Sequence, residues 1–460
     1  MKYQSTRGGV KGISFKDAVL MGLADDGGLL VPESIPDVSH ELADWRGLDY
    51  QALALKVLGK FIDDIPTDDL QRIINKSYAT FTDPLVTPLV PLGDDHVLEL
   101  FHGPTLAFKD VALQLLGNLF EYILDERGHS VNILGATSGD TGSAAIAGVR
   151  GKKNINIYIM FPEGRTSPLQ ELQMTSILDP NVHNIAIAGS FDDCQALMKR
   201  VFSDLPFKQQ YGLAAVNSVN WTRVLAQVVY YFSAWNQAGS PEHFDVCVPT
   251  GNFGNIFAGY IAQQMGLPIR RLILATNAND ILCRFFNSGR YERQEVHFTH
   301  SPAMDIQISS NFERYLFYKL NRSATQVKAF MASFSATGSA ELPDHEGVVD
   351  AAIVAGSASN EQTLATIRKV YETHGYLADP HTAVGLAVMQ TYADPQVPLV
   401  CLATAHPAKF EDSIYEALPA VTVSHPTLEA LRQLPTRKTL LAADEATIKG
   451  FITAGGQGQG

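Results

Sequence analysis

The chain has few cysteines, a minority of basic residues and no long apolar run. None of its cysteines forms a CxxC pair with another; they are Cys194, Cys247, Cys283 and Cys401. This spacing argues against a disulfide framework and against a cysteine zinc site, and it fits a reducing compartment best. The 48 acidic residues outnumber the 35 lysines and arginines, so the net charge is −13. That charge argues against nucleic acid or an anionic membrane as the main partner, but it leaves room for a small basic pocket.

Targeting and membrane signals are also lacking. Residues 1–9 contain no apolar signal core, and no segment approaches the length of a transmembrane helix, so we expect a cytoplasmic protein. What the chain does contain is apolar sequence, 46% of 460 residues, which is enough to bury a large core. This length predicts two or three domains.

The organisation of the chain changes near residue 96. Before it, helical patterns are interrupted by glycine and proline and end at a proline cluster, Pro84, Pro88 and Pro91. After it, short apolar strands alternate with helices, which predicts a mostly parallel sheet covered on both faces. The predicted strands are 131–134, 155–159, 185–188, 214–217, 246–249 and 399–404. The predicted helices are 110–123, 144–149, 168–178, 194–201 (capped by Ser190), 222–235 and 256–265. Residues 455–460 are low in complexity, and we expect them to be disordered.

The most informative segment is 98–110, where an extended stretch broken by Gly103 and Pro104 leads into an apolar helix. Lys109 lies at the start of that helix, beside Phe108. Loss of hydration there would favour the neutral amine, which can attack a carbonyl. The common alternative is a lysine that extends to water from a helix start. The neighbouring motifs favour the chemical interpretation.

Two loops between a strand and a helix are suited to binding anions. The first, 248–255, contains Gly251 and Gly254 and precedes the helix 256–265, so its backbone N–H groups and the helix dipole could hold a phosphate. The second, 136–143, offers four hydroxyl groups and two glycines at a helix start. Neither loop matches a Walker motif or GxGxxG, which argues against nucleotide binding. A tight turn without a ligand is the alternative for each loop.

Further polar residues follow two other strands. Asn217, Ser218 and Arg223 could point into the crevice at the carboxyl ends of the strands, and an arginine there suits a phosphate. A surface arginine at a helix start is the alternative. His406 follows the strand 399–404 and could act as a base, but with Pro407 beside it a turn histidine that bonds to the backbone is favoured.

Four motifs together resemble the threonine synthase family. They are the Gly-Pro-Thr segment before Lys109, the Ser-Gly-Asp-Thr-Gly loop of 138–142, the Gly-Asn-Phe-Gly-Asn loop of 251–255, and the Thr-Ala-His-Pro segment of 404–407. They occur in the family's order over nearly the whole chain, including the N-terminal domain of the longer bacterial and fungal branch. The resemblance implies pyridoxal phosphate as cofactor and no metal. It also implies an α/β fold of two open, mostly parallel twisted sheets covered by helices, fold type II, plus a mainly helical N-terminal domain.

The resemblance also implies domain boundaries. We expect an N-terminal domain at 1–95, a large cofactor-binding domain at 96–124 and 226–440, a small mobile domain at 125–225, and a C-terminal extension at 441–460. The small domain would close on the large one and exclude water. The protein would be a monomer or a homodimer.

Site roles follow from the matched motifs. Lys109 would form a Schiff base with the cofactor and later move protons. The cofactor phosphate would lie on the loop Gly251, Asn252, Phe253, Gly254 and Asn255. Thr404 would face the pyridine nitrogen, and Asp140 the 3′-oxygen, although related folds often have an asparagine amide there. The substrate would contact Ser138, Thr141, Asn217, Ser218 and Arg223.

The implied reaction converts O-phospho-L-homoserine and water to L-threonine and phosphate. Two alternatives stay open. One is a phospho-lyase with the same cofactor that releases 2-oxobutyrate. The other is a non-catalytic protein that binds phosphometabolites, and the retained Lys109 argues against it. The product formed from phosphohomoserine would separate these functions.

Overall fold

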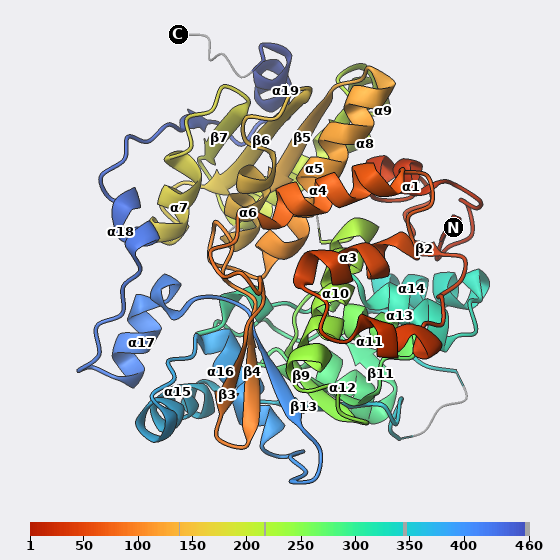
Figure 1. The fold of residues 1–460 in the computed structure, drawn as a ribbon. Coiled ribbons are helices and arrows are strands. Elements are labelled where there is room, and N and C mark those ends of the chain that lie inside the picture. Colours follow the sequence, from red (N-terminus) through yellow and green to blue (C-terminus); the bar gives the residue numbers. More distant parts are fainter. Residues whose placement is uncertain (138, 216–217, 344–346, 456–460) are drawn as a thin grey trace.

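The computed structural model describes residues 1–137, 139–215, 218–343 and 347–455, and two main sheets form separate layers within them (Figure 1). The large sheet has the strand order β13-β10-β9-β14-β4-β3, and the small sheet has the order β15-β7-β6-β5-β8. All neighbouring strands in both sheets are parallel except β3 and β4. The predicted fold class of two mostly parallel sheets is confirmed.

The strands of the large sheet are β3 (Leu89–Leu92), β4 (Asp95–Glu99), β9 (Phe244–Pro249), β10 (Ile269–Thr276), β13 (Ile353–Ser357) and β14 (Leu399–Ala403). Those of the small sheet are β5 (Val131–Ala136), β6 (Ile155–Pro162), β7 (Val182–Ile187), β8 (Leu213–Ala214) and β15 (Thr439–Leu441). Every residue of β9 and β14 is buried. Central parallel strands are covered on both faces, which is why these two read as continuous apolar runs.

The N-terminal part is mainly helical, as predicted. Its elements are β1 (Tyr3–Ser5), α1 (Phe15–Met21), β2 (Leu30–Pro32), η1 (Ser39–Glu41), α2 (Leu42–Trp45), α3 (Tyr50–Gly59) and α4 (Thr67–Tyr78). Helices α3 and α4 pack against each other; α4 also packs against α5 (Lys109–Arg127), and α3 against α10 (Trp221–Gln237). Figure 1 shows this part in red to orange, with α3 beside α10.

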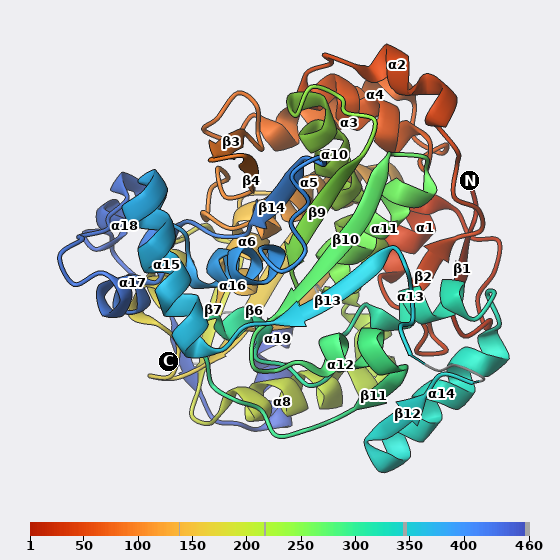
Figure 2. The ribbon, with the colours of Figure 1, turned by 90° about the horizontal axis from the view of Figure 1, so that it is seen from below.

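The remaining helices cover the sheets. Around the small sheet they are α6 (Asp140–Val149), α7 (Pro168–Thr175), α8 (Phe191–Ser203), α9 (Leu205–Gln210) and α19 (Glu445–Thr453). Those that follow β9 are α11 (Gly254–Gln264), α12 (Ile281–Ser288), η2 (Pro302–Met304), α13 (Phe312–Lys319), α14 (Ala324–Thr337), α15 (Asn360–His374), α16 (Pro380–Met389), η3 (Pro407–Lys409), α17 (Glu411–Ala417) and α18 (Pro426–Leu431). A short antiparallel pair, β11 (Arg290–Glu292) and β12 (Ser339–Glu341), stands apart. Figure 2 shows α16 on one side of the large sheet and α11 on the other. Among the described residues, no helix has the length and apolar character needed to cross a bilayer.

Most predicted elements are present, with shifted ends. Ser190 caps α8 in a capping box, as predicted. The helix predicted at 144–149 begins at Asp140, and the helix predicted at 256–265 begins at Gly254. Both begin earlier because the polar loop residues before them already have helical geometry. The strand predicted at 214–217 is Leu213–Ala214, and residues 216–217 lie outside the described residues, as do 456–460 of the predicted disordered tail.

Two short strands lie across the predicted domain boundaries. β3, within residues 1–95, pairs with β4 and so joins the large sheet. β15, at the end of the predicted large domain, pairs with β7 of the small sheet. The C-terminal segment with α17, α18 and α19 therefore extends from the large sheet to the small sheet (Figure 1). The division into domains remains a proposal.

Candidate active site

A cavity lies at the carboxyl ends of the large-sheet strands, where open parallel sheets bind ligands. The loop after β9 and the residue after β14 line it from the large sheet, and the start of α6 lines it from the small sheet. The predicted site residues that line it are Lys109, Asp140, Thr141, Ser218, Arg223, Gly251, Asn252, Phe253, Gly254, Asn255 and Thr404. The other two, Ser138 and Asn217, lie outside the described residues.

Lys109 is held at the cavity by the docking of its own segment against the end of β14. The amide N–H of Phe108 donates to the carbonyl oxygen of Thr404 over 2.8 Å, and that of His406 donates to the carbonyl oxygen of Leu106 over 3.1 Å. Leu106 has a φ of 59°. A branched side chain rarely adopts this left-handed conformation, and such strain is common at functional sites. Lys109 is then the first residue of α5.

The surroundings of the Lys109 amine make it easier to deprotonate than an exposed lysine. The side chain is 11% exposed, and its Nζ atom lies 5.1 Å from the centre of the Phe108 ring. Burial lowers the pKa of Lys109; the Asp140 carboxylate opposes this, and the charges of Lys409 and Arg223 add to it. A lysine whose pKa is lowered is a better nucleophile.

Asp140, the first residue of α6, lies between two lysines. Its Oδ2 atom is 3.5 Å from Lys109 Nζ, and its Oδ1 atom is 2.7 Å from Lys409 Nζ. Gln170 Nε2 also donates to Oδ1 over 3.1 Å. Burial by itself raises the pKa of Asp140, but the two ammonium groups outweigh burial and the pKa is lowered. The carboxyl group is therefore ionised and accepts hydrogen bonds only.

The loop 251–255 presents its backbone at the N-terminus of α11. The residue with positive φ is Phe253, at 62°, and not a glycine. Its ring stacks on Phe286 at 5.8 Å, which stabilises that conformation. Gly251 is needed for a different reason, because a Cβ atom there would lie 2.9 Å from the carbonyl oxygen of Ala303. The loop therefore approaches its neighbours closely and begins an 11-residue helix, which suits a phosphate group.

The Asn255 side chain adds a free donor to this loop. Its Oδ1 atom accepts hydrogen bonds from the hydroxyls of Tyr230 over 2.5 Å and Tyr231 over 3.0 Å. Its buried Nδ2 atom has no partner among the described residues. A buried donor without a partner is costly, so the amide is suited to an anionic ligand in the cavity.

Arg223, the third residue of α10, is the second unpaired donor. The residue is 5% exposed, and its Nε and Nη1 atoms have no hydrogen-bond partner among the described residues. Burial lowers the pKa of Arg223 to about 10, so it stays charged at neutral pH. A buried cation is stable only when it is paired. The cavity is therefore built to receive negative charge.

Three cavity-side features were not found from the sequence. Asn311 Nδ2 donates to the carbonyl oxygens of Ser218 and Asn252, so it joins the two predicted anion-binding segments. His381 lines the cavity. Its Nδ1 atom lies 2.9 Å from Asp379 Oδ1, and its Nε2 atom accepts a hydrogen bond from the amide N–H of Ala303. Lys409 is the last residue of the segment Ala-His-Pro-Ala-Lys, 405–409. Its closeness in sequence to the Thr-Ala-His-Pro motif was the one feature that could have pointed to it.

His406 has the role that the proline beside it predicted. Its Nδ1 atom accepts a hydrogen bond from the amide N–H of Ala408 over 3.2 Å. Burial, followed by the nearby His425, lowers the pKa of His406 to about 4. The ring is thus neutral at physiological pH and caps η3.

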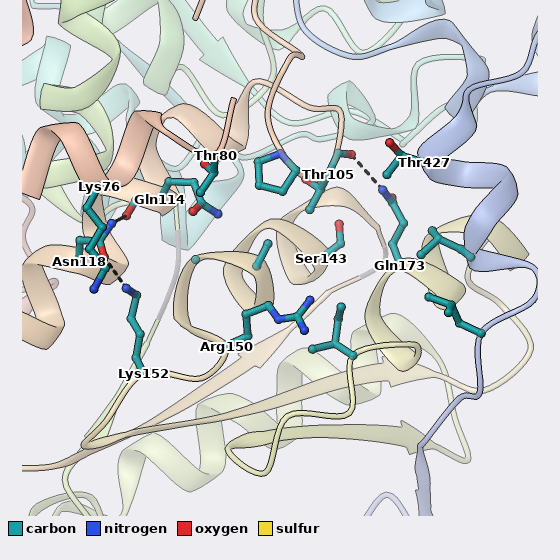
Figure 3. Close-up of a pocket in the computed structure, with 16 residues that line it drawn as sticks. Lys76, Thr80, Thr105, Gln114, Asn118, Ser143, Arg150, Lys152, Gln173 and Thr427 are labelled. Atoms are coloured by element: carbon teal, nitrogen blue, oxygen red, sulfur yellow. Dashed lines mark hydrogen bonds between the residues drawn. The ribbon is translucent and has the colours of Figure 1, made fainter. Parts of the chain in front are cut away.

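A second cavity, of about 510 Å³, lies on the other side of α6 (Figure 3). Asp140 and Thr141 face the first cavity, whereas Ser143 and Ala147 line the second one. In its wall, Gln173 Nε2 donates to the carbonyl oxygen of Thr105 over 3.0 Å. This bond ties α7 to the segment just before Lys109.

The residues of the first cavity fit pyridoxal phosphate. A lysine with a lowered pKa suits the aldehyde of the cofactor. The backbone of 251–255 and the free Asn255 amide suit its phosphate. A family model described as pyridoxal-phosphate dependent enzyme matches residues 86–401, which carry the large sheet and the cavity. The chain is a pyridoxal-phosphate-dependent enzyme of fold type II, and pyridoxal phosphate is its cofactor.

Two further models identify the family. One described as threonine synthase N terminus matches residues 2–78, and one described as threonine synthase, C-terminal, matches residues 382–452. The chain is also 47% identical to the threonine synthase of Pseudomonas aeruginosa over 99% of both chains. It belongs to the threonine synthase family.

Solved structures agree with this assignment. A pyridoxal-phosphate-bound threonine synthase from Brucella melitensis has a TM-score of 0.96 and 45% identity, with 100% of both chains covered. A yeast threonine synthase has a TM-score of 0.94 and 42% identity, with 99% of this chain and 98% of that chain covered. The predicted fold class, cofactor and family are confirmed.

Proposed function

We propose that the cavity binds O-phospho-L-homoserine and converts it, with water, to L-threonine and phosphate. The observation that carries this proposal is Arg223, a buried guanidinium in the same cavity as Lys109, two of whose nitrogen atoms have no partner within the described part of the chain. A substrate phosphate would pair with it, and the planar fork of arginine suits two parallel hydrogen bonds. The site then holds one anion at Arg223 and a second at the 251–255 loop.

The cofactor contacts are assigned residue by residue. Lys109 would hold the cofactor covalently, the loop 251–255 would bind its phosphate, Thr404 would face its pyridine nitrogen, and Asp140 would lie beside its 3′-oxygen. When bound, the cofactor supplies the electron sink for removal of a proton from Cα. The hydroxyl of Thr404 would leave the ring nitrogen largely unprotonated. A carboxylate at this position would instead stabilise the protonated ring nitrogen.

The substrate contacts complete the assignment. Arg223 and Ser218 would bind the substrate phosphate, together with Asn217. Thr141, at the N-terminus of α6, would bind the substrate carboxylate together with Ser138. Ser218 supports this role because its Oγ atom is 2.6 Å from Ser310 Oγ, which in turn donates to Asn252 Oδ1. These hydroxyls join the substrate-phosphate segment to the cofactor-phosphate loop.

Bond changes occur at three substrate carbons. Protons leave Cα and Cβ, the Cγ–O bond breaks and phosphate departs. A water molecule then supplies the hydroxyl group at Cβ and releases one proton. Of the three protons released, Cα regains one, Cγ takes one and becomes a methyl group, and the departing phosphate takes the third. Lys109 is the group assigned to move the proton at Cα, and its flexible side chain would also reach Cβ. One amine can thus serve several steps.

Exclusion of water would come from movement of the small domain, proposed at residues 125–225. The cavity is lined by the large sheet on one side and by the start of α6 on the other, so a change in the distance between the sheets would open or close it. Closure keeps water out until the step that needs it.

Product analysis tests the proposal. Purified enzyme with pyridoxal phosphate and phosphohomoserine should form L-threonine and phosphate in equal amounts. Formation of 2-oxobutyrate would indicate the phospho-lyase instead, and formation of homoserine would indicate a phosphatase. The Lys109→Ala variant is the matched control, because any product that it still forms comes from a contaminant.

We also propose that the enzyme acts in the cytoplasm as a monomer or homodimer. All four cysteines are free and buried, and Cys247 Sγ donates to the carbonyl oxygen of Gly385 over 3.2 Å. Free thiols without disulfides suit a reducing compartment. Gel filtration with light scattering would measure the oligomeric state.

A further inference from the structure

Lys409 is a fully buried lysine that lies outside the assigned machinery. Its side chain is 0% exposed, and Nζ lies 2.7 Å from Asp140 Oδ1. The same Nζ donates to the carbonyl oxygen of Thr105 over 2.7 Å. Lys409 therefore connects η3, the start of α6 and the segment before Lys109.

The two contacts hold Lys409 in one position. The Thr105 carbonyl also accepts from Gln173 Nε2 (Figure 3), and the hydroxyl of Thr105 donates to Asp110 Oδ1 over 2.7 Å. Lys409 thus donates to a carbonyl group that is itself fixed between α5 and α7. An ammonium group fixed in this way acts as a stationary charge beside Asp140.

Asp140 has unequal contacts with the two lysines. The Lys409 ammonium lies at 2.7 Å from one carboxylate oxygen, while the Lys109 amine lies at 3.5 Å from the other. A buried carboxylate that faced Lys109 alone would pair with it and keep it protonated, because attraction between opposite charges is strong in a dry environment. With Lys409 at the shorter distance, Lys109 is the more distant of the two ion-pair partners of Asp140.

We propose that Lys409 is a positioning residue that holds Asp140 as a carboxylate and keeps it from forming a close ion pair with Lys109. The Lys109 amine can then lose its proton and bind the cofactor. The inference rests on the proposed function of Lys109. Other charged or titratable groups near this site are Arg223 on α10, His381 on α16 and Asp110 on α5. The lowered pKa of Lys109, to which Lys409 contributes after burial, agrees with this arrangement.

The test measures how readily Lys109 reacts as pH changes. The full chain, freed of cofactor with hydroxylamine, is mixed with pyridoxal phosphate, and the rate of Schiff base formation is followed by visible absorbance. In Lys409→Met, Asp140 faces Lys109 alone, so the pH midpoint of this rate should rise by about one unit. At a given pH below the midpoint, a rise of about one unit lowers the fraction of neutral Lys109 amine about tenfold. Lys409→Arg keeps the charge and should restore the midpoint. Lys438→Met removes an exposed lysine of the small sheet and should leave the midpoint unchanged.

A second pair of variants covers a failure of Lys409→Met to fold. Asp140→Asn should lower the midpoint, because it removes the carboxylate that favours protonated Lys109. Adding Lys409→Met to Asp140→Asn should not raise the midpoint above that of the wild type. If Lys409→Met folds with an unchanged midpoint, or if Asp140→Asn leaves the midpoint unchanged, the inference is wrong. Neither result depends on the substrate, so the proposed reaction would be judged separately by its products.

Discussion

Gly117 of α5 and Gly148 of α6 meet where the two helices cross, and neither position has room for a Cβ atom. A Cβ atom on Gly117 would overlap the carbonyl oxygen of Gly148, and one on Gly148 would overlap the carbonyl oxygen of Leu113. The backbones therefore touch at this crossing. Because α5 begins at Lys109 and α6 at Asp140, the glycine contact sets how closely these two functional groups approach.

Alanine at this crossing should separate the helices. We expect Gly148→Ala to lower the free energy of unfolding by about 1–3 kcal/mol, because excess volume in a packed interface forces the backbone to shift. Urea denaturation would measure the loss. Gly450→Ala in α19 is the matched control, since nothing lies within 4 Å of its Cβ position and alanine favours the helix. If both variants have the same stability, the crossing is not tightly packed in solution.

Lys109 should carry the cofactor. Reduction of the purified enzyme with borohydride, followed by peptide mapping, should place the pyridoxyl group on Lys109, because this amine has a lowered pKa and lines the cavity. Lys109→Ala should have no turnover, although the 251–255 loop could still hold the cofactor phosphate. A label on Lys409 or any other lysine would contradict the assignment.

Arg223→Ala should weaken the capture of phosphohomoserine far more than that of a phosphate-free amino acid. A hydrogen bond to a charged group contributes about 1.5–3 kcal/mol, which is about 10- to 100-fold in affinity. Titration of the cofactor spectrum with each ligand measures the two affinities. Arg432→Ala, at an exposed arginine, is the control. Equal losses for both ligands would mean that Arg223 is structural or that it binds the carboxylate.

The sequence predicted which segments meet at the cavity better than it predicted the contacts that hold them together. Lys109 and the 251–255 loop could be found because each lies within one short contiguous motif. The Asn311 bridge could not be found, because it joins Ser218 and Asn252 across long sequence separations. The role of Lys409 depends likewise on Asp140, which is brought close only when the small sheet packs against the large one.

Backbone geometry was also only partly predictable. The 251–255 loop contains two glycines, but Phe253 has its positive φ, and aromatic packing compensates for that conformation. The ends of α6 and α11 were misplaced because small and polar residues read as loop even when they form the first helical turn. The strands of the two sheets were easier to predict, because parallel strands covered on both faces leave a continuous apolar signature.

Asp110 should make stability depend on pH. Burial raises the pKa of Asp110 to about 6, although hydrogen bonds from the hydroxyl and the amide N–H of Thr105 act to lower it. The folded state then holds a proton that the unfolded chain has lost, so this contribution is complete below the ordinary pKa of 3.8 and is lost as pH rises through about 6. Relative to Asp110→Asn, the wild-type free energy of unfolding should fall by the order of 3 kcal/mol between about pH 4 and pH 7. Asp192→Asn, at an exposed aspartate, should show no such difference from the wild type. The prediction is contradicted if the difference in free energy of unfolding between the wild type and Asp110→Asn does not change with pH.

The bond that breaks in phosphohomoserine should be Cγ–O. A lysine suited to carbonyl chemistry and a buried arginine that would bind phosphate without attacking it favour elimination followed by addition of water, and not hydrolysis at phosphorus. In ¹⁸O-labelled water, mass spectrometry should find the label in the β-hydroxyl group of threonine and none in the phosphate. Homoserine with labelled phosphate would show attack at phosphorus, and 2-oxobutyrate with unlabelled phosphate would show the lyase. The label therefore separates three reactions that all release phosphate and that a phosphate assay alone would not distinguish.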